Sequence, residues 1–150
     1  MSGWENAQPI TEVDLLAGTP PAEALLTSDT PWVARGYLSK WPVVQHAKQG
    51  SENALSYLAG FYEGRPVSAF LAEPETKGRF FYNEDVTGFN FVQVDTRLDQ
   101  VFSKLLSLEN EPNPPSLYVG STQTSVWLPG FNEAHPLPMA LPGVMTSLWI

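Results

Sequence analysis

Apolar positions along the chain recur with both helical and extended spacing, so the sequence predicts a mixed set of short elements. The clearest helical pattern lies between residues 96 and 108, where apolar side chains recur every three or four positions: Leu98, Val101, Phe102, Leu105 and Leu106. The same spacing predicts a helix from Ser51 to about Tyr62 that ends before Gly64. Apolar, β-prone runs predict strands at 32–34, 67–72, 80–82, 117–119 and 144–150.

Proline and glycine mark the connections between these elements. A pair of prolines at 20–21 leads into a short predicted helix at 22–26. Pro74 and Gly78 separate two predicted strands in the manner of a hairpin loop. The segment 129–142 contains several prolines, and we therefore expect it to be a loop without regular structure.

The composition is that of a globular protein, and it limits the partners. The chain has 150 residues, of which 43% are apolar and 16% charged, and one domain is expected at this length. Its net charge of −8 would repel a phosphate backbone and an anionic membrane surface, so we expect no nucleic acid and no membrane as a partner. The sequence has no cysteine, no apolar run long enough to span a bilayer and no secretory signal at its start, which together predict a cytoplasmic protein.

The familiar catalytic signatures are missing from the sequence. Its two histidines, His46 and His135, are far apart, and neither is followed two positions later by an acid. Neither can therefore begin a two-histidine, one-carboxylate iron site, and we expect both to be surface or loop residues. Zinc motifs, phosphate-binding loops, dinucleotide-binding glycine motifs and the nucleophile elbow of serine hydrolases are also absent.

The most informative part of the chain begins at Gly78, where aromatic residues alternate with polar groups able to bind a ligand. The relevant segments are GRFFYNED at 78–85, GFNF at 88–91, PWVARG at 31–36, LYVG at 117–120 and SLWI at 147–150. Together they resemble the N-terminal part of the cupin-like, Jumonji-related oxygenases that use iron(II) and 2-oxoglutarate, a family that includes protein asparaginyl hydroxylases. The resemblance covers about residues 20–150 and rests on spaced aromatic and glycine positions.

The resemblance implies an α+β fold, in which N-terminal helices and a β-hairpin lead into the first strands of a double-stranded β-helix, the jelly roll of cupins. Residues 1–19 would be a flexible N-terminal arm. Residues 20–150 would be the N-terminal part of a cupin-like domain of JmjC type, truncated at its C-terminal end. The chain stops where the family would turn into its His-x-Asp iron motif, so we expect the double-stranded β-helix to be incomplete.

The resemblance also implies site residues. Tyr118 lies in the context in which the family's tyrosine donates its hydroxyl to a carboxylate of 2-oxoglutarate, and a phenol suits this role because it joins a donor to an apolar ring. The substrate entrance would be lined by Tyr82 and, after it, by Asn83, Glu84, Asp85 and Asn90. On the residues alone, Tyr118 could instead be a core tyrosine, 83–85 a solvated turn, and Asn90 a residue facing a pocket or water.

Four further large or charged side chains are expected to be structural. Arg35 and Arg79 could each neutralise a carboxylate, but the family's cation for 2-oxoglutarate comes from the half of the domain that is absent here. We therefore predict structural roles for both, with Arg35 a partner for a buried carboxylate. Trp127 and Trp149 are expected to fill the core.

The resemblance predicts the N-terminal half of an iron(II)- and 2-oxoglutarate-dependent dioxygenase, a hydroxylase of a protein side chain or a small molecule. Because the iron triad is absent, we expect this chain to bind neither iron(II) nor 2-oxoglutarate tightly and to show no turnover. The alternative is a complete, non-catalytic interaction or dimerisation module, which would form a homodimer through its aromatic segment at 80–91, or a pseudo-enzyme.

Overall fold

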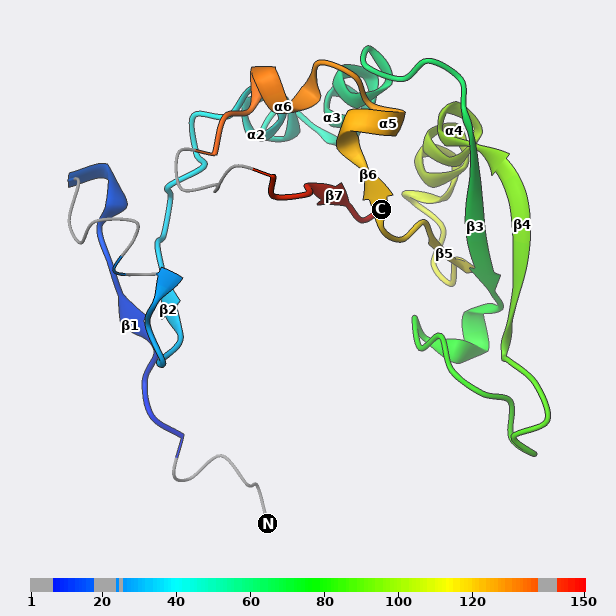
Figure 1. The fold of residues 1–150 in the computed structure, drawn as a ribbon. Helices are drawn as coiled ribbons and strands as arrows, with labels where there is room; N and C mark the ends of the chain where they lie inside the picture. The colour runs from blue at the N-terminus through cyan, green and yellow to red at the C-terminus, as the bar shows by residue number, and fades with distance from the viewer. Residues whose placement is uncertain (1–6, 18–23, 25, 138–142) are drawn as a thin grey trace.

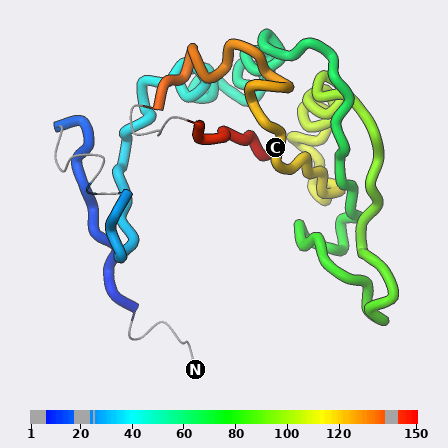
Figure 2. The backbone as a smooth tube through the Cα atoms, in the orientation of Figure 1, coloured from blue at the N-terminus to red at the C-terminus, as the bar shows by residue number. Residues whose placement is uncertain are grey.

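The described elements of the chain are arranged as an arch. The computed structural model describes residues 7–17, 24, 26–137 and 143–150. Two short N-terminal strands lie in one leg of the arch, the longest strands lie in the other, and helices join the two legs (Figures 1 and 2). Most of the helix predicted at 22–26, and part of the arm at 1–19, lie outside the described residues. Helices and strands are mixed along the chain, which confirms the α+β class.

The N-terminal leg is a pair of short parallel strands. β1 (Thr11–Glu12) pairs with β2 (Trp32–Val33), and the 3-10 turn η1 (Leu15–Ala17) follows β1. Arg35 forms an ion pair with Glu12, in which Nε and Oε1 are 2.6 Å apart. The two side chains are 73% and 59% exposed, so the prediction of a buried carboxylate partner for Arg35 is wrong.

Three longer helices lie between the legs and against the sheet: α2 (Pro42–Ala47), α3 (Ser51–Ala59) and α4 (Leu98–Leu108). α4 confirms the predicted apolar stripe. α2 begins with a proline in its first turn, where a helix needs no N–H donor. α3 ends before the predicted residue because the N–H groups of Phe61 and Tyr62 bond to carbonyls three positions back, which tightens the helix into a turn.

The second leg is built on a three-stranded antiparallel sheet. Its central strand is β3 (Pro66–Ala72), with β4 (Phe91–Arg97) on one side and β5 (Ser116–Tyr118) on the other. The strands predicted at 67–72 and 117–119 are thus confirmed. β4 was not predicted, although it is as long as β3.

The strand predicted at 80–82 is wrong. After β3 the chain forms the 3-10 turn η2 (Pro74–Thr76) and then an arm in which Tyr82 and Phe89 make an isolated antiparallel bridge. The Asn83 N–H donates to the Gly88 carbonyl at 2.9 Å. The arm is therefore a small hairpin of its own, and the partner of β3 is β4 instead.

The central sheet has one face in the core. Alternate residues of a strand point to opposite faces, and Val67 and Ala69 of β3 are buried while Ser68 and Phe70 are only partly covered. The buried core comes from the sheet, α3, α4 and segments after β5: Leu58, Val67, Ala69, Leu98, Val101, Phe102, Val119, Leu128 and Phe131. Val94 of β4 and Leu117 of β5 pack against it. The opposite face of the sheet, which carries Phe70, points away from this core.

The last described segments cover the core. β6 (Thr122–Gln123) pairs with β7 (Ser147–Leu148), and the short helices α5 (Thr124–Trp127) and α6 (Phe131–Ala134) follow β6. The sheets of the described residues have two, three and two strands. They are separate small sheets, so these residues do not close a barrel.

The loop predicted at 129–142 is wrong where α6 forms. The helix fits between Pro129, which precedes it, and Pro136, which follows it, so neither proline has to supply a helical N–H. Gly130 enters the helix with a φ of 85°, a left-handed conformation that glycine adopts without strain. Residues 138–142 lie outside the described part of the chain.

The two tryptophans predicted to fill the core have different positions. Trp127 packs against the core, and its Nε1 donates to the Pro66 carbonyl at 2.9 Å. Trp149 is 62% exposed, so its predicted core position is wrong. In this extended segment Leu148 and Ile150 pack on the core, and alternation turns Trp149 away from it.

Among the helices that the structure describes, none has the length and apolar character needed to cross a bilayer.

Candidate functional site

Aromatic side chains gather on the face of the central sheet that points away from the core. In the register of the sheet, Phe70 of β3 pairs with Tyr118 of β5, and Ala72 pairs with Phe91 of β4. Phe70, Tyr118 and Phe91 therefore share one face. The ring centroid of Phe70 is 5.8 Å from that of Tyr118 and 5.5 Å from that of Phe91.

Two further rings reach this face from other segments. Phe80, in the arm between β3 and β4, has its ring centroid 5.7 Å from Tyr118 and 5.5 Å from Phe91. Trp149, which follows β7, lies 5.8 Å from Tyr118. We call Phe70, Phe80, Phe91, Tyr118 and Trp149 the aromatic face. Tyr118 is at its centre, held by rings from three other segments and half-buried.

An open depression of about 1300 Å³ lies beside the aromatic face. Its lining comes from η2 and the turn after it, the arm, β5 and the last residue of the chain. Three predicted site residues line it, namely Tyr118, Tyr82 and Asn90, together with Arg79, Phe80 and Phe81. The structure therefore brings the predicted cosubstrate residue and part of the predicted substrate entrance to one place.

Gly120 makes room for the Tyr118 phenol. A Cβ atom at Gly120 would overlap the Tyr118 hydroxyl oxygen and would lie only 2.7 Å from ring atom Cζ. Any side chain there would therefore push the phenol out of its place. Within the described residues, the hydroxyl of Tyr118 has no hydrogen-bond partner. Packing alone holds the phenol, and its donor is free for a ligand.

Asn90 has a structural part in the depression. Its Oδ1 accepts a hydrogen bond from the Phe81 N–H, and its Nδ2 donates to the Arg79 carbonyl, both at 2.8 Å. The Asn90 N–H donates to the Phe81 carbonyl at 2.9 Å. The side-chain amide is therefore used to fix the backbone of residues 79–81, and Asn90 positions other lining residues.

The three polar residues after Tyr82 form a turn at the tip of the arm and do not line the depression. The Val86 N–H donates to the Asn83 carbonyl at 3.1 Å, which closes a turn over Glu84 and Asp85. Asp85 Oδ1 accepts hydrogen bonds from the Thr87 hydroxyl at 2.6 Å and the Thr87 N–H at 3.1 Å. These bonds from Thr87 hold the pKa of Asp85 below its usual value.

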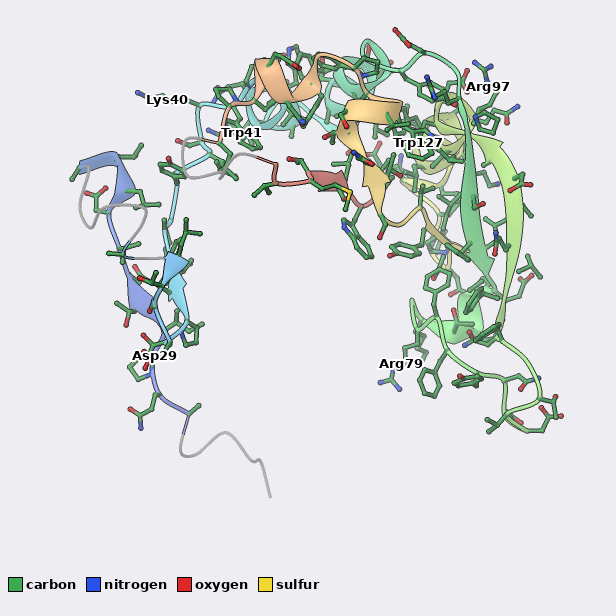
Figure 3. The ribbon with its side chains drawn as sticks, viewed as in Figure 1. Asp29, Lys40, Trp41, Arg79, Arg97 and Trp127 are labelled. Carbon is green, nitrogen blue, oxygen red and sulfur yellow. The ribbon has the colours of Figure 1, made fainter. Side chains whose placement is uncertain are left out.

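Arg79 lies at the rim of the depression, and its side chain extends away from the sheet (Figure 3). The ion pairs formed within the described residues are Arg35 with Glu12 and Arg97 with Asp99. The guanidinium of Arg79 belongs to neither, and the structural role predicted for it stays a prediction. Its position directly before three consecutive aromatic residues was the signal that sequence reasoning did not use.

The described residues do not offer a metal site. Within them, His, Cys, Asp and Glu side chains nowhere gather in a group of three. His135, predicted at the surface or in a loop, is buried with 3% exposed. Its Nδ1 hydrogen bonds to the Phe131 carbonyl at 2.7 Å, and its Nε2 accepts from the Val43 N–H at 3.1 Å. Both ring nitrogens are occupied, and the iron(II) implied by the resemblance does not fit these residues.

Comparison with known proteins identifies the domain. No curated protein sequence and no solved structure matches the chain. Residues 20–150 match the family model described as the cupin-like domain. The matched region contains the aromatic face, the depression and every predicted site residue. The chain therefore belongs to the cupin-like domain family.

Proposed function

We propose that the chain carries the cosubstrate- and substrate-facing wall of a cupin-like oxygenase of the iron(II)- and 2-oxoglutarate-dependent type. Membership of the cupin-like domain family supports an oxygenase-type function at the coarse level. The observation that carries the finer proposal is the unpartnered hydroxyl of Tyr118, held at the centre of an aromatic face beside an open depression. The substrate would be a protein side chain or a small molecule, and the reaction a hydroxylation.

In this proposal the chain's own residues bind and orient organic acids. The Tyr118 phenol donates its O–H to a carboxylate of 2-oxoglutarate. The rings of Phe70, Phe80 and Trp149 lower the local dielectric around that hydrogen bond, and this strengthens it. When bound, 2-oxoglutarate would supply two electrons through its decarboxylation to succinate and carbon dioxide, while the residues of the depression would hold it in place.

Iron has no part in the steps that we assign to this chain, because the described residues do not fit it. We expect no iron-dependent formation of succinate from 2-oxoglutarate by the purified chain. The measurement is a succinate assay with iron(II) and 2-oxoglutarate present, and clear turnover would overturn this part of the proposal.

The role of Tyr118 is tested by binding of 2-oxoglutarate alone. Without metal chelation we expect a weak complex, with Kd on the order of 1 mM. Tyr118→Phe removes the hydroxyl but keeps the ring, and it should weaken binding about tenfold, because a hydrogen bond to a charged group is lost. Saturation-transfer NMR measures the binding of 2-oxoglutarate to the wild type and to Tyr118→Phe.

Tyr37→Phe is the matched control, since Tyr37 is also half-buried and does not line the depression. It should bind 2-oxoglutarate as the wild type does. Absence of binding to the wild type, or equal binding to Tyr118→Phe, would contradict the role of Tyr118.

A second function, a non-catalytic interaction module, is favoured by exposed apolar side chains along the arm. Phe81, Val86 and Phe89 are 67%, 67% and 58% exposed. Neighbouring exposed apolar side chains often mark a surface that binds another protein or a second copy of the chain. Sedimentation velocity over a wide concentration range tests a homodimer, and Phe89→Ser should abolish it. A monomer at every concentration would exclude self-association.

A further inference from the structure

The depression has a floor and a rim with different character. The ring of Phe80 faces the floor, where it contacts Phe91 and Tyr118. Phe81 is 67% exposed, and its ring lies 5.3 Å from that of Tyr82. Arg79 is exposed, like Phe81 two positions further along the chain. Arg79, Phe81 and Tyr82 therefore make a rim outside the site proposed for 2-oxoglutarate at Tyr118.

The rim is fixed at the level of its backbone. The Arg79 N–H donates to the Thr76 carbonyl at 3.0 Å, and the Arg79 carbonyl accepts from Asn90 Nδ2 at 2.8 Å. The Phe81 N–H is held by Asn90 Oδ1 at 2.8 Å. The cation and the aromatic side chains are thus presented from an ordered base, which reduces the entropy lost when they bind a ligand.

Arg79 is the only Lys or Arg among the described residues that line the depression. The chain has eight Lys and Arg against 16 Asp and Glu, and its net charge is −8. Glu75 lines the same depression, yet it forms no ion pair with Arg79. The exposed guanidinium of Arg79, without an ion-pair partner in the described part of the chain, offers a planar fork of N–H donors to a carboxylate. The exposed rings of Phe81 and Tyr82, close to Arg79 along the chain, offer apolar surface to the group that carries the carboxylate.

We propose that Arg79 is a specificity-determining residue, which selects as substrate a small organic acid whose carboxylate is joined to an aromatic or other apolar group. The carboxylate binds the Arg79 guanidinium, and the apolar group lies on Phe81 and Tyr82. This inference rests on the proposed function, because it assigns the substrate class of the same depression. Arg79 serves the substrate at the rim, whereas Tyr118 serves 2-oxoglutarate at the floor.

The experiment compares two probes of the same shape, 3-phenylpropionate and its neutral amide 3-phenylpropanamide. Their dissociation constants are measured by NMR titration of the full chain. We expect the wild type to bind the acid about five to ten times more tightly than the amide, because a charged hydrogen-bonded pair adds to the apolar contact. Arg79→Gln should reduce this ratio to about one and leave amide binding unchanged.

Two other arginine variants sharpen the comparison. Arg65→Gln removes the same charge from an exposed residue that does not line the depression, and it should keep the wild-type preference. Arg79→Lys keeps the charge but loses the planar fork, so it should retain only part of the preference. Since the Arg79 side chain is exposed, Arg79→Gln and Arg79→Lys should both fold. If Arg79→Gln does not, the intermediate ratio expected of Arg79→Lys becomes the deciding measurement.

The results separate this inference from the proposed function. Equal affinity of the wild type for acid and amide, or an unchanged preference in Arg79→Gln, would overturn it. A preference that disappears in Tyr118→Phe but not in Arg79→Gln would overturn it as well, because the carboxylate would then bind at the floor. If 2-oxoglutarate binding proves independent of Tyr118 while the acid still depends on Arg79, the proposed function fails and this inference stands.

Discussion

His135 links two parts of the chain that are far apart in sequence. Its ring accepts a hydrogen bond from the Val43 N–H at the start of α2 and bonds to the Phe131 carbonyl in α6. The ring also stacks on Phe131, with centroids 4.0 Å apart. Because the first turn of a helix leaves N–H groups without helical partners, His135 acts as a side-chain acceptor for α2.

Replacing His135 with Phe tests this structural role. The new ring keeps the stacking but leaves the Val43 N–H without its acceptor, so the free energy of unfolding should fall by about 1–3 kcal/mol. Urea denaturation measures the change. His46→Phe is the control, because His46 stacks on Tyr57 without a described hydrogen bond, and its effect should stay within about 0.5 kcal/mol. Equal effects of the two substitutions would contradict the role of His135.

The position of His135 could not be predicted from the sequence. Nothing near it indicates burial, since Pro136 follows directly and the segment has the composition of a loop. Its burial depends on Trp41 and Val43, which approach only in the folded chain. Tyr118 could be predicted as a site residue, because the family resemblance assigns it without any knowledge of its neighbours in space.

Asp85 provides a prediction for pH. Hydrogen bonds from the Thr87 hydroxyl and N–H lower its pKa in the folded state. A lowered pKa means that the contribution to the stability of the turn is present above the unfolded pKa, and is lost as the pH falls through the folded pKa. Thr87→Val removes the hydroxyl, the largest cause, and should raise the Asp85 pKa toward 3.8.

The midpoint of the Asp85 titration can be followed by NMR of its side-chain carboxyl carbon. Asp95 is a useful internal reference, since it lies in β4 outside the turn. An Asp85 midpoint that does not move in Thr87→Val would show that the hydroxyl is not the cause of the lowered pKa.

At the scale of elements, patterns within one segment were predictable and pairings between segments were not. The stripe of α4 predicted its bounds well, because one helix face meets the core at Leu98, Val101 and Phe102. β4 also alternates, with Val92 and Val94 on one face and Gln93 and Asp95 on the other. This alternation is typical of a strand and could have predicted β4. The aromatic residues at 80–82 are also β-prone, and the strand was predicted there instead.

The arm that replaces the predicted strand depends on Asn90. Asn90→Ala removes the hydrogen bonds to the Phe81 N–H and the Arg79 carbonyl, and it should accelerate amide exchange of Phe81 about five- to tenfold. Asn53→Ala is the matched control, since the Asn53 amide bonds only to the Gln49 carbonyl in α3. Unchanged exchange at Phe81 would show that Asn90 does not hold the arm.

The candidate site also shows what one sequence can predict. Tyr118, Tyr82 and Asn90 were assigned from the resemblance, and the fold brings them to one depression. The segment 83–85 was drawn to the turn at the tip by its own short-range hydrogen bonds. Arg79 gained its importance because the fold places it in the lining of the depression, where no other described lining residue is a Lys or Arg.

At the scale of the molecule, the two legs of the arch should differ in stability. Of the described residues that form the core or pack against it, none precedes Val43. The pair β1–β2 has only two residues in each strand, and its ion pair, Arg35 with Glu12, is exposed. A short ladder with little apolar burial costs little free energy to open. The N-terminal leg should therefore open without unfolding the core.

Hydrogen exchange and Glu12→Gln test this difference. The Val13 amide, bonded to the Val33 carbonyl at 2.9 Å, should exchange much faster than the Ala69 amide in the central strand. Glu12→Gln should speed Val13 exchange further, while the free energy of unfolding measured by urea changes by less than about 0.5 kcal/mol. Glu133→Gln, which removes an exposed acid in α6, should leave Val13 unchanged. Equal protection of Val13 and Ala69 would mean that the two legs unfold as one cooperative unit.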